Sequence, residues 1–169
     1  MDSPVVAELA WAITRAGHAT LRFNYRGVGA SQGSFSGGPG ELDDLEAAIE
    51  QLRETTSCDT VAIAGYSFGA HAAVAVAARR EDVTKVILVA PPTTILSFAG
   101  LDSLRAEVLV VVPEHDQLLD PVELDRLLAP LGGRARTVRV EGADHYLCQG
   151  LSSVGRAAAA FLGAPVRPG

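Results

Sequence analysis

The sequence has few aromatic residues, few cysteines and no long apolar run. Aromatic side chains make up 5% of the 169 residues, so the core must pack mainly through aliphatic and small side chains. The two cysteines, Cys58 and Cys148, are too few for a disulfide framework, and we expect reduced thiols in a cytoplasmic protein. No apolar run approaches the ~20 residues of a membrane span, and no signal-peptide pattern opens the sequence. We therefore expect no contact with a membrane.

Positive charge is also scarce. The chain carries 14 Lys and Arg against 20 Asp and Glu, which gives a formal net charge of −6. An acidic surface repels phosphate backbones, so we expect no nucleic-acid partner. The length suits a single domain, and we predict one domain over residues 1–169 with a frayed tail at 163–169. The sequence carries no signal for an oligomeric state.

Helical and strand patterns alternate along the chain. The strands expected at 85–90 and 107–112 are apolar throughout, which is typical of a parallel sheet covered on both faces. We therefore predict an α/β fold, a three-layer α/β/α sandwich with a mostly parallel sheet. The expected strands span residues 19–24, 60–64, 85–90, 107–112 and 137–141. The expected helices span residues 4–16, 41–53, 68–79, 121–128 and 151–162.

The most informative segment is Gly65-Tyr66-Ser67-Phe68-Gly69, which lies between an expected strand and an expected helix. This Gly-x-Ser-x-Gly pattern is typical of a nucleophile elbow, a tight turn that holds the serine in a strained conformation. We expect side chains at positions 65 and 69 to collide, so that both must be glycine. The helix would aim its N-terminus at Ser67, and the Phe68 N–H would serve as an oxyanion donor. A chance match is the alternative, and the strand-helix context argues against it.

A nucleophilic serine needs a base, and the base needs an orienting acid. In strand–elbow–helix hydrolases the order along the chain is serine, acid, histidine. Asp116 follows the strand 107–112, and His145 follows the strand 137–141. Both lie at carboxyl ends of strands, where open α/β sheets place their sites. We predict Ser67 as nucleophile, Asp116 as acid and His145 as base.

The other histidines fit the role of base less well. His71 lies one turn into the helix after Ser67 and points along that helix. His18 precedes a strand and so lies at the opposite end of the sheet. His115 comes before the acid in the chain, although it could line the site.

Among the acids, Glu114 is the alternative to Asp116 because it follows the same strand. Asp120 is better explained as the cap of the helix that begins at Pro121. Asp144 is expected to be a turn residue beside His145.

The glycine-rich loop 27–33 follows a strand and could indicate dinucleotide binding. Its spacing fails the fingerprint, because Gln32 stands where the third glycine belongs and no helix begins there. We interpret the loop as a turn at the edge of the active site. The sequence implies no organic cofactor and no metal.

Three segments together resemble the α/β-hydrolase superfamily: residues 21–33, the elbow 65–70 and the histidine loop 142–145. The likeness covers nearly the whole chain and is nearest to small bacterial hydrolases with little or no lid, related to dienelactone hydrolases. Dienelactone hydrolases have a cysteine nucleophile where this chain has Ser67. The resemblance therefore implies an α/β-hydrolase fold and esterase-like chemistry.

The sequence departs from this family before the helix 4–16, where the family has one or more strands. One of them lies between the counterparts of 19–24 and 60–64, and the loop after it supplies the second oxyanion donor. The chain thus resembles an N-terminally truncated family member. Either it is a fragment, or a gene model with a misplaced start at Met1, or it is a shortened variant in which 19–24 pairs directly with 60–64.

These patterns together predict a serine hydrolase that cleaves a small ester or related acyl substrate through an acyl-enzyme intermediate. One alternative is a non-catalytic or weakly active binding domain on the same fold, because fold does not fix function. Another is acyl transfer, in which an alcohol or thiol replaces water.

Overall fold

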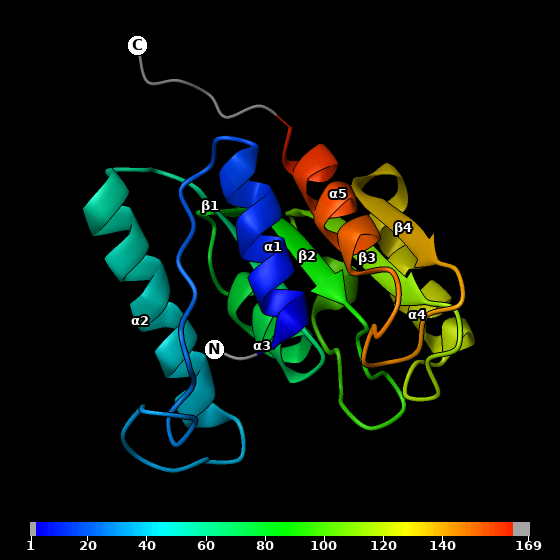
Figure 1. The fold of residues 1–169 in the computed structure, drawn as a ribbon, viewed down its shortest axis with the longest axis horizontal. Coiled ribbons are helices and arrows are strands. Elements are labelled where there is room, and N and C mark those ends of the chain that lie inside the picture. The colour runs from blue at the N-terminus through cyan, green and yellow to red at the C-terminus, as the bar shows by residue number, and fades with distance from the viewer. Residues whose placement is uncertain (1–2, 164–169) are drawn as a thin grey trace.

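A parallel four-stranded sheet forms the centre of the protein (Figure 1). The computed structural model describes residues 3–163, so most of the tail predicted at 163–169 lies outside the described residues. The strand order is β1-β2-β3-β4, and every neighbouring pair is parallel. The prediction of a parallel sheet is therefore confirmed. The strands are β1 (Val61–Tyr66), β2 (Val83–Val89), β3 (Glu107–Pro113) and β4 (Ala135–Val140).

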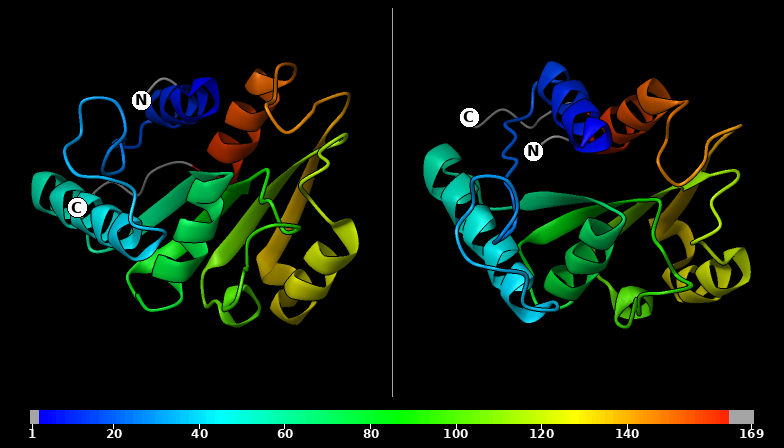
Figure 2. Two further views of the ribbon diagram at one scale, coloured as in Figure 1. Left: turned by 90° about the horizontal axis from the view of Figure 1, so that it is seen from below. Right: turned by 60° about the horizontal axis from the view of Figure 1, so that its bottom comes forward.

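Helices cover both faces of the sheet, which confirms the three-layer architecture (Figure 2). On one face lie α1 (Pro4–Arg15) and α5 (Leu151–Leu162), which pack against each other. On the other face lie α2 (Pro39–Thr56), α3 (Phe68–Ala77) and α4 (Pro121–Leu128). Two short 3₁₀ helices, η1 (Leu101–Ser103) and η2 (Ala129–Arg134), complete the second face. Within residues 3–163, no helix is both long and apolar enough to cross a membrane.

The core is divided by the sheet into two apolar clusters. Along β2, Val86 and Leu88 belong to the cluster under α2 and α3, whereas Ile87 and Val89 belong to the cluster under α1 and α5. All four side chains are fully buried. This alternation follows from the two-residue period of a strand, and it explains why β2 is apolar throughout.

The strand expected at residues 19–24 does not form. These residues have no regular secondary structure, and in the described part of the chain β1 pairs with β2 alone. Figure 1 shows the segment, in blue, passing between α2 and α1. A strand requires a neighbour for its backbone hydrogen bonds, and no strand among residues 3–163 pairs with this segment. Direct pairing of 19–24 with 60–64, as expected for a shortened variant, is therefore wrong for this structure.

Side chains of α2 hold the loop that follows this segment. The Arg26 backbone N–H and guanidinium donate to the Asp44 carboxylate at 2.7–3.2 Å. Glu41 is fully buried and accepts hydrogen bonds from the Ser36 N–H and hydroxyl and from the Gly38 N–H, at 2.8–2.9 Å. The loop is thus fixed by charged side chains in place of a sheet.

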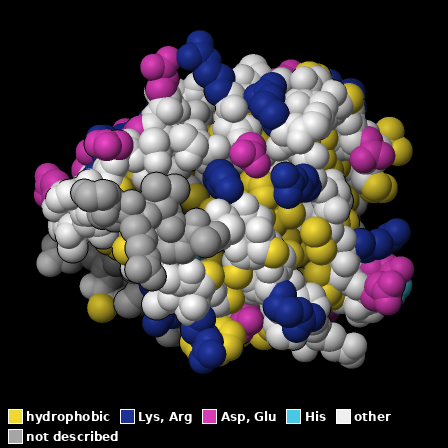
Figure 3. Space-filling model, turned by 90° about the horizontal axis from the view of Figure 1, so that it is seen from above, with side chains coloured by type: hydrophobic (Ala, Val, Ile, Leu, Met, Phe, Trp, Pro, Cys, Tyr) yellow, Lys and Arg dark blue, Asp and Glu magenta, His cyan; other side chains and the backbone are white. Residues whose placement is uncertain are grey.

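Charged side chains are dispersed on the face of the molecule seen in Figure 3. Lys and Arg lie singly there, among acidic and apolar side chains. A nucleic-acid binding surface is typically a continuous basic patch or stripe. The arrangement on this face fits the acidic net charge of the chain.

Candidate active site

Ser67 lies in the turn between β1 and α3, in the conformation expected of an elbow. Its φ of 53° and ψ of −116° are unusual for a residue with a side chain, and its N–H donates to the Val89 carbonyl at 3.0 Å. A Cβ at Gly65 would lie 2.0 Å from the Gly69 carbonyl oxygen, so glycine is required there. At Gly69 a Cβ would meet nothing within 4 Å. The expectation that both glycines are sterically required is therefore wrong for Gly69.

Three polar side chains form a continuous hydrogen-bonded series at the carboxyl ends of the strands. The Ser67 Oγ lies 3.0 Å from His145 Nε2, and His145 Nδ1 lies 2.9 Å from Asp116 Oδ2. A carboxylate only accepts hydrogen bonds, so in the neutral imidazole Nδ1 carries the proton. Nε2 is then free to accept the Ser67 hydroxyl proton.

Asp116 is placed to hold the imidazole. Its side chain has no exposed surface, and that of His145 is 11% exposed. The second oxygen of Asp116 accepts the Leu118 backbone N–H at 2.8 Å. With both oxygens engaged, the carboxylate fixes the orientation of the ring.

The loop that carries His145 is anchored from two sides. Tyr66 donates its hydroxyl hydrogen bond to the His145 carbonyl at 3.0 Å, and the two rings lie 5.7 Å apart. Burial, followed by the negative charge of Asp116, raises the pKa of Tyr66, so its hydroxyl stays a donor. Glu114 accepts the Gly142 N–H at 2.8 Å. That hydrogen bond and the nearby Arg139 hold the pKa of Glu114 below its ordinary value.

The alternative histidines lie away from the Ser67 hydroxyl group. His71 Nδ1 contacts the Ser97 carbonyl at 2.6 Å, and His18 Nε2 contacts the Gly163 carbonyl at 2.8 Å. The His115 side chain is 67% exposed and lies 3.9 Å from Glu114.

The alternative acids have other structural contacts. Glu114 binds the Gly142 backbone, as described above. Asp120 caps α4, accepting the N–H groups of Val122 and Glu123. Asp144 lies in a turn, where its carbonyl accepts the Leu147 N–H and its side chain lies 3.4 Å from the Cys148 N–H.

The N-terminus of α3 begins directly after Ser67. The Phe68 N–H is the first of the helix, where backbone N–H groups lack intrahelical acceptors. These groups point outward from the helix end and favour negative charge. The Phe68 N–H stays the predicted oxyanion donor.

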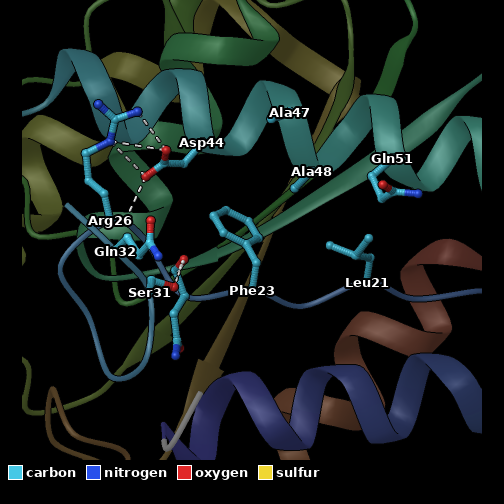
Figure 4. A pocket seen from close by; sticks show the side chains of 10 residues that line it. Leu21, Phe23, Arg26, Ser31, Gln32, Asp44, Ala47, Ala48 and Gln51 are labelled. Carbon is cyan, nitrogen blue, oxygen red and sulfur yellow. Dashed lines mark hydrogen bonds and ion pairs between the residues drawn. The ribbon is translucent and has the colours of Figure 1, made fainter.

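A groove beside α2 does not contain these residues. It has a volume of about 360 Å³ and lies between residues 21–32 and α2 (Figure 4). Figure 4 shows Leu21 and Phe23 directed toward α2, with Arg26 paired to Asp44 at one end. None of Ser67, Asp116 and His145 lines it. Across residues 3–163, no three His, Cys, Asp or Glu side chains are grouped so as to hold a metal.

Two residues near the catalytic candidates were not found from the sequence. Tyr66 occupies a variable position of the Gly-x-Ser-x-Gly pattern, so nothing in the pattern indicates that its hydroxyl reaches His145. Phe35 lies in the loop before α2, and its ring contacts that of Phe68 with centroids 5.9 Å apart. Both contacts join segments that lie far apart in the sequence. The spacing of apolar residues along the chain gives no information on such contacts.

Comparisons with known proteins identify the family of the chain. The sequence model of the family described as serine aminopeptidase, S33, matches residues 2–99, more than half of the chain. Among curated relatives, the uncharacterized protein RP471 of Rickettsia prowazekii is 27% identical over 155 residues. The uncharacterized protein Rv2307c of Mycobacterium tuberculosis is 30% identical over 168 residues. The matches include 86% and 85% of this chain, but only 65% and 59% of the two relatives.

Solved structures give the same result. An α/β serine hydrolase homologue from Coxiella burnetii is 32% identical, with a TM-score of 0.87, and the match covers 96% of this chain and 78% of that one. XC6422 from Xanthomonas campestris, described as an α/β serine hydrolase without lid, is 32% identical with a TM-score of 0.85. That match covers 99% of this chain and 77% of the other. The fold, the family model and these relatives together show that the chain belongs to the serine aminopeptidase, S33, family of α/β hydrolases.

Proposed function

We propose that the protein is a serine hydrolase that cleaves a small ester or related acyl substrate through Ser67, His145 and Asp116. The observation that carries the proposal is the hydrogen-bonded series from the Ser67 Oγ through His145 to Asp116, with distances of 3.0 and 2.9 Å. A nucleophile, a base and an orienting acid within hydrogen-bond reach are what acyl transfer to serine needs.

In the first half of the reaction, the Ser67 oxygen attacks the acyl carbonyl carbon while His145 Nε2 takes the hydroxyl proton. Asp116 stabilises the imidazolium that forms, without itself becoming protonated. The tetrahedral intermediate collapses as His145 returns the proton to the leaving alcohol, and the acyl group stays on Ser67. Water, deprotonated by His145, then attacks the acyl-enzyme carbonyl, and His145 returns that proton to the Ser67 oxygen as the bond to the acyl group breaks and the acid leaves.

The Phe68 N–H supports the developing negative charge on the carbonyl oxygen. Oxyanion holes of this fold use two donors, one of them from a loop elsewhere in the chain. A missing donor costs roughly 10²–10³ in rate. We therefore expect the Phe68 N–H to contribute a rate factor of this order.

The experiment is steady-state hydrolysis of p-nitrophenyl acetate by the 169-residue protein and three variants. Ser67→Ala and His145→Ala are each expected to lower kcat by about 10⁶, because the serine and its base act as a unit. His71→Ala is the matched control, since His71 lies in the helix after Ser67 but contacts the Ser97 carbonyl. Equal turnover by parent and His145→Ala would contradict the proposal.

The same experiment separates the two other functions. A non-catalytic binding domain predicts no turnover above that of Ser67→Ala. Acyl transfer predicts an ester or thioester product when an alcohol or thiol is added, at the expense of free acid. Hydrolysis predicts free acid with and without the acceptor.

A further inference from the structure

The loop between β4 and α5, which carries His145, contains a leucine in an unusual backbone conformation. Leu147 has a φ of 55°, in the left-handed region that residues with a side chain rarely adopt. Leucine has neither the freedom of glycine nor a short polar side chain that bonds locally, so this conformation costs free energy. Strained residues of this kind persist only where the surrounding structure fixes them.

The side chain of Leu147 is what fixes this backbone. It is fully buried and belongs to the apolar cluster under α1 and α5. Ala143, in the same loop, and Val154, on α5, are fully buried members of the same cluster. The burial of a leucine side chain is large enough to offset the cost of a left-handed backbone. Leu147 therefore anchors the loop in the core.

The anchored residue closes the turn that presents the catalytic base. The Leu147 N–H donates to the Asp144 carbonyl at 3.0 Å, so His145 and Tyr146 are the two central residues of a four-residue turn. Of these four residues, only Leu147 is fully buried, and Tyr146 is 72% exposed. The turn is thus tied to the core through Leu147, and a shift of Leu147 would move His145 with it.

The anchor acts at a different point from the two contacts already described. Tyr66 binds the carbonyl of His145 itself, and Glu114 binds the Gly142 N–H before it. Leu147 holds the chain after His145. The loop is therefore fixed on both sides of the base.

We propose that Leu147 is a positioning residue, whose buried side chain and left-handed backbone hold His145 between Ser67 and Asp116. This inference rests on the proposed function and adds a residue to it. The two hydrogen bonds of His145, at 3.0 and 2.9 Å, constrain the ring from both nitrogens. A displacement of about 1 Å in a catalytic group costs roughly 10² in rate. Because Leu147 lies in the core, it acts through the turn and not on the substrate.

The first test is steady-state hydrolysis of p-nitrophenyl acetate. Leu147→Ala removes the anchor, and we expect kcat to fall about tenfold with KM within twofold of that of the parent. Leu147→Met keeps the buried apolar volume, so it should restore kcat to within twofold of the parent. Leu147→Gly removes the side chain without leaving a strained backbone and should lose less stability than Leu147→Ala. Its kcat should also fall about tenfold, so this variant decides the question if Leu147→Ala does not fold.

The matched control is Leu9→Ala. Leu9 belongs to the same apolar cluster and is 4% exposed, but it lies on α1, which packs against α5 and β1. This variant should lower Tm by several degrees, as Leu147→Ala does, and leave kcat within twofold of the parent at a temperature where both are folded. An equal loss of kcat from Leu9→Ala, or a parental kcat in Leu147→Gly, would overturn the proposal.

A proton NMR spectrum keeps this inference separate from the proposed function. The His145 Nδ1 proton donated to Asp116 should give a resonance downfield of the amides, identified by its loss in His145→Ala. It should persist in Leu9→Ala and Leu147→Met and should broaden or vanish in Leu147→Gly. A parent without this resonance, or an unchanged resonance in Leu147→Gly, would overturn the inference even where hydrolysis requires His145. If the parent hydrolyses no ester, the hydrolase is wrong, and the resonance still decides whether Leu147 positions His145.

Discussion

Residues 19–24 and β4 have similar patterns of apolar and polar residues but different structures. In both, apolar and polar side chains alternate: Leu21 and Phe23 are separated by Arg22, and Val138 and Val140 by Arg139. β4 forms a ladder with β3, whereas residues 19–24 form no strand. Because strand hydrogen bonds come from a neighbour, alternation defines a suitable sequence but does not by itself produce a strand.

The contrast extends to the functional residues. Ser67, Asp116 and His145 all follow strands of the sheet, so backbone ladders fix the points from which they project. The region from 19 to 38 is fixed by carboxylates of α2, Asp44 and Glu41. We expect the stability of the sheet to be sensitive to backbone changes. We expect the stability of residues 19–38 to be sensitive to changes of charge.

The largest effect on the free energy of unfolding is expected from proline substitutions that compare the sheet with residues 19–24. Val110 lies in the middle of β3, paired with both β2 and β4, so Val110→Pro should cost more than about 3 kcal/mol or prevent folding. Arg22→Pro should change the free energy of unfolding by less than about 1 kcal/mol, since Arg22 is exposed and outside any ladder. Urea denaturation measures both. A similar loss from Arg22→Pro would show that residues 19–24 carry backbone hydrogen bonds.

A second comparison lies within the elbow. Gly65→Ala should destabilise the protein by about 3 kcal/mol, because its Cβ would overlap the Gly69 carbonyl. Gly69→Ala has free space around the added carbon and should stay within about 1 kcal/mol of the parent. Thermal unfolding of the two variants gives the difference. Equal destabilisation would mean that the turn requires both glycines.

Glu41 tests the role of charge in holding residues 19–38. Its burial favours the neutral form, but hydrogen bonds from Ser36 and Gly38 prevail, and the pKa of Glu41 lies below its ordinary value. The ionised form therefore stabilises the fold above that ordinary pKa of about 4.3, and this stabilisation is lost as the pH falls through the lowered pKa. Glu41→Gln should lower Tm by several degrees at pH 7 and by less at pH 3. A difference in Tm that does not vary with pH would contradict this account.

The smallest effect is expected from Tyr66→Phe, which removes the hydroxyl that binds the His145 carbonyl but keeps the ring. A net hydrogen bond contributes about 1 kcal/mol, so kcat should fall about fivefold if it holds the histidine loop for catalysis. KM for p-nitrophenyl acetate should stay unchanged. An unchanged kcat with a lowered Tm would assign the hydroxyl to stability alone.

What the sequence predicts well are features that depend on local patterns. The elbow, the cap at Asp120 and the continuous apolar strands each rest on neighbouring residues, and the structure has them where the sequence predicts them. The segment 19–24 fails because its outcome depends on a partner strand. The free space at Gly69 and the ring contact of Phe35 depend likewise on atoms brought in by folding.

The central claim, that Ser67 is a nucleophile activated by His145, is tested most directly by the rate of labelling with a fluorophosphonate. Mass spectrometry of the parent should locate the adduct on Ser67, and Ser67→Ala should remain unlabelled. His145→Ala should react about 10³-fold or more slowly, with its Tm close to that of the parent. A folded parent that stays unlabelled, or equal labelling rates for parent and His145→Ala, would contradict the account.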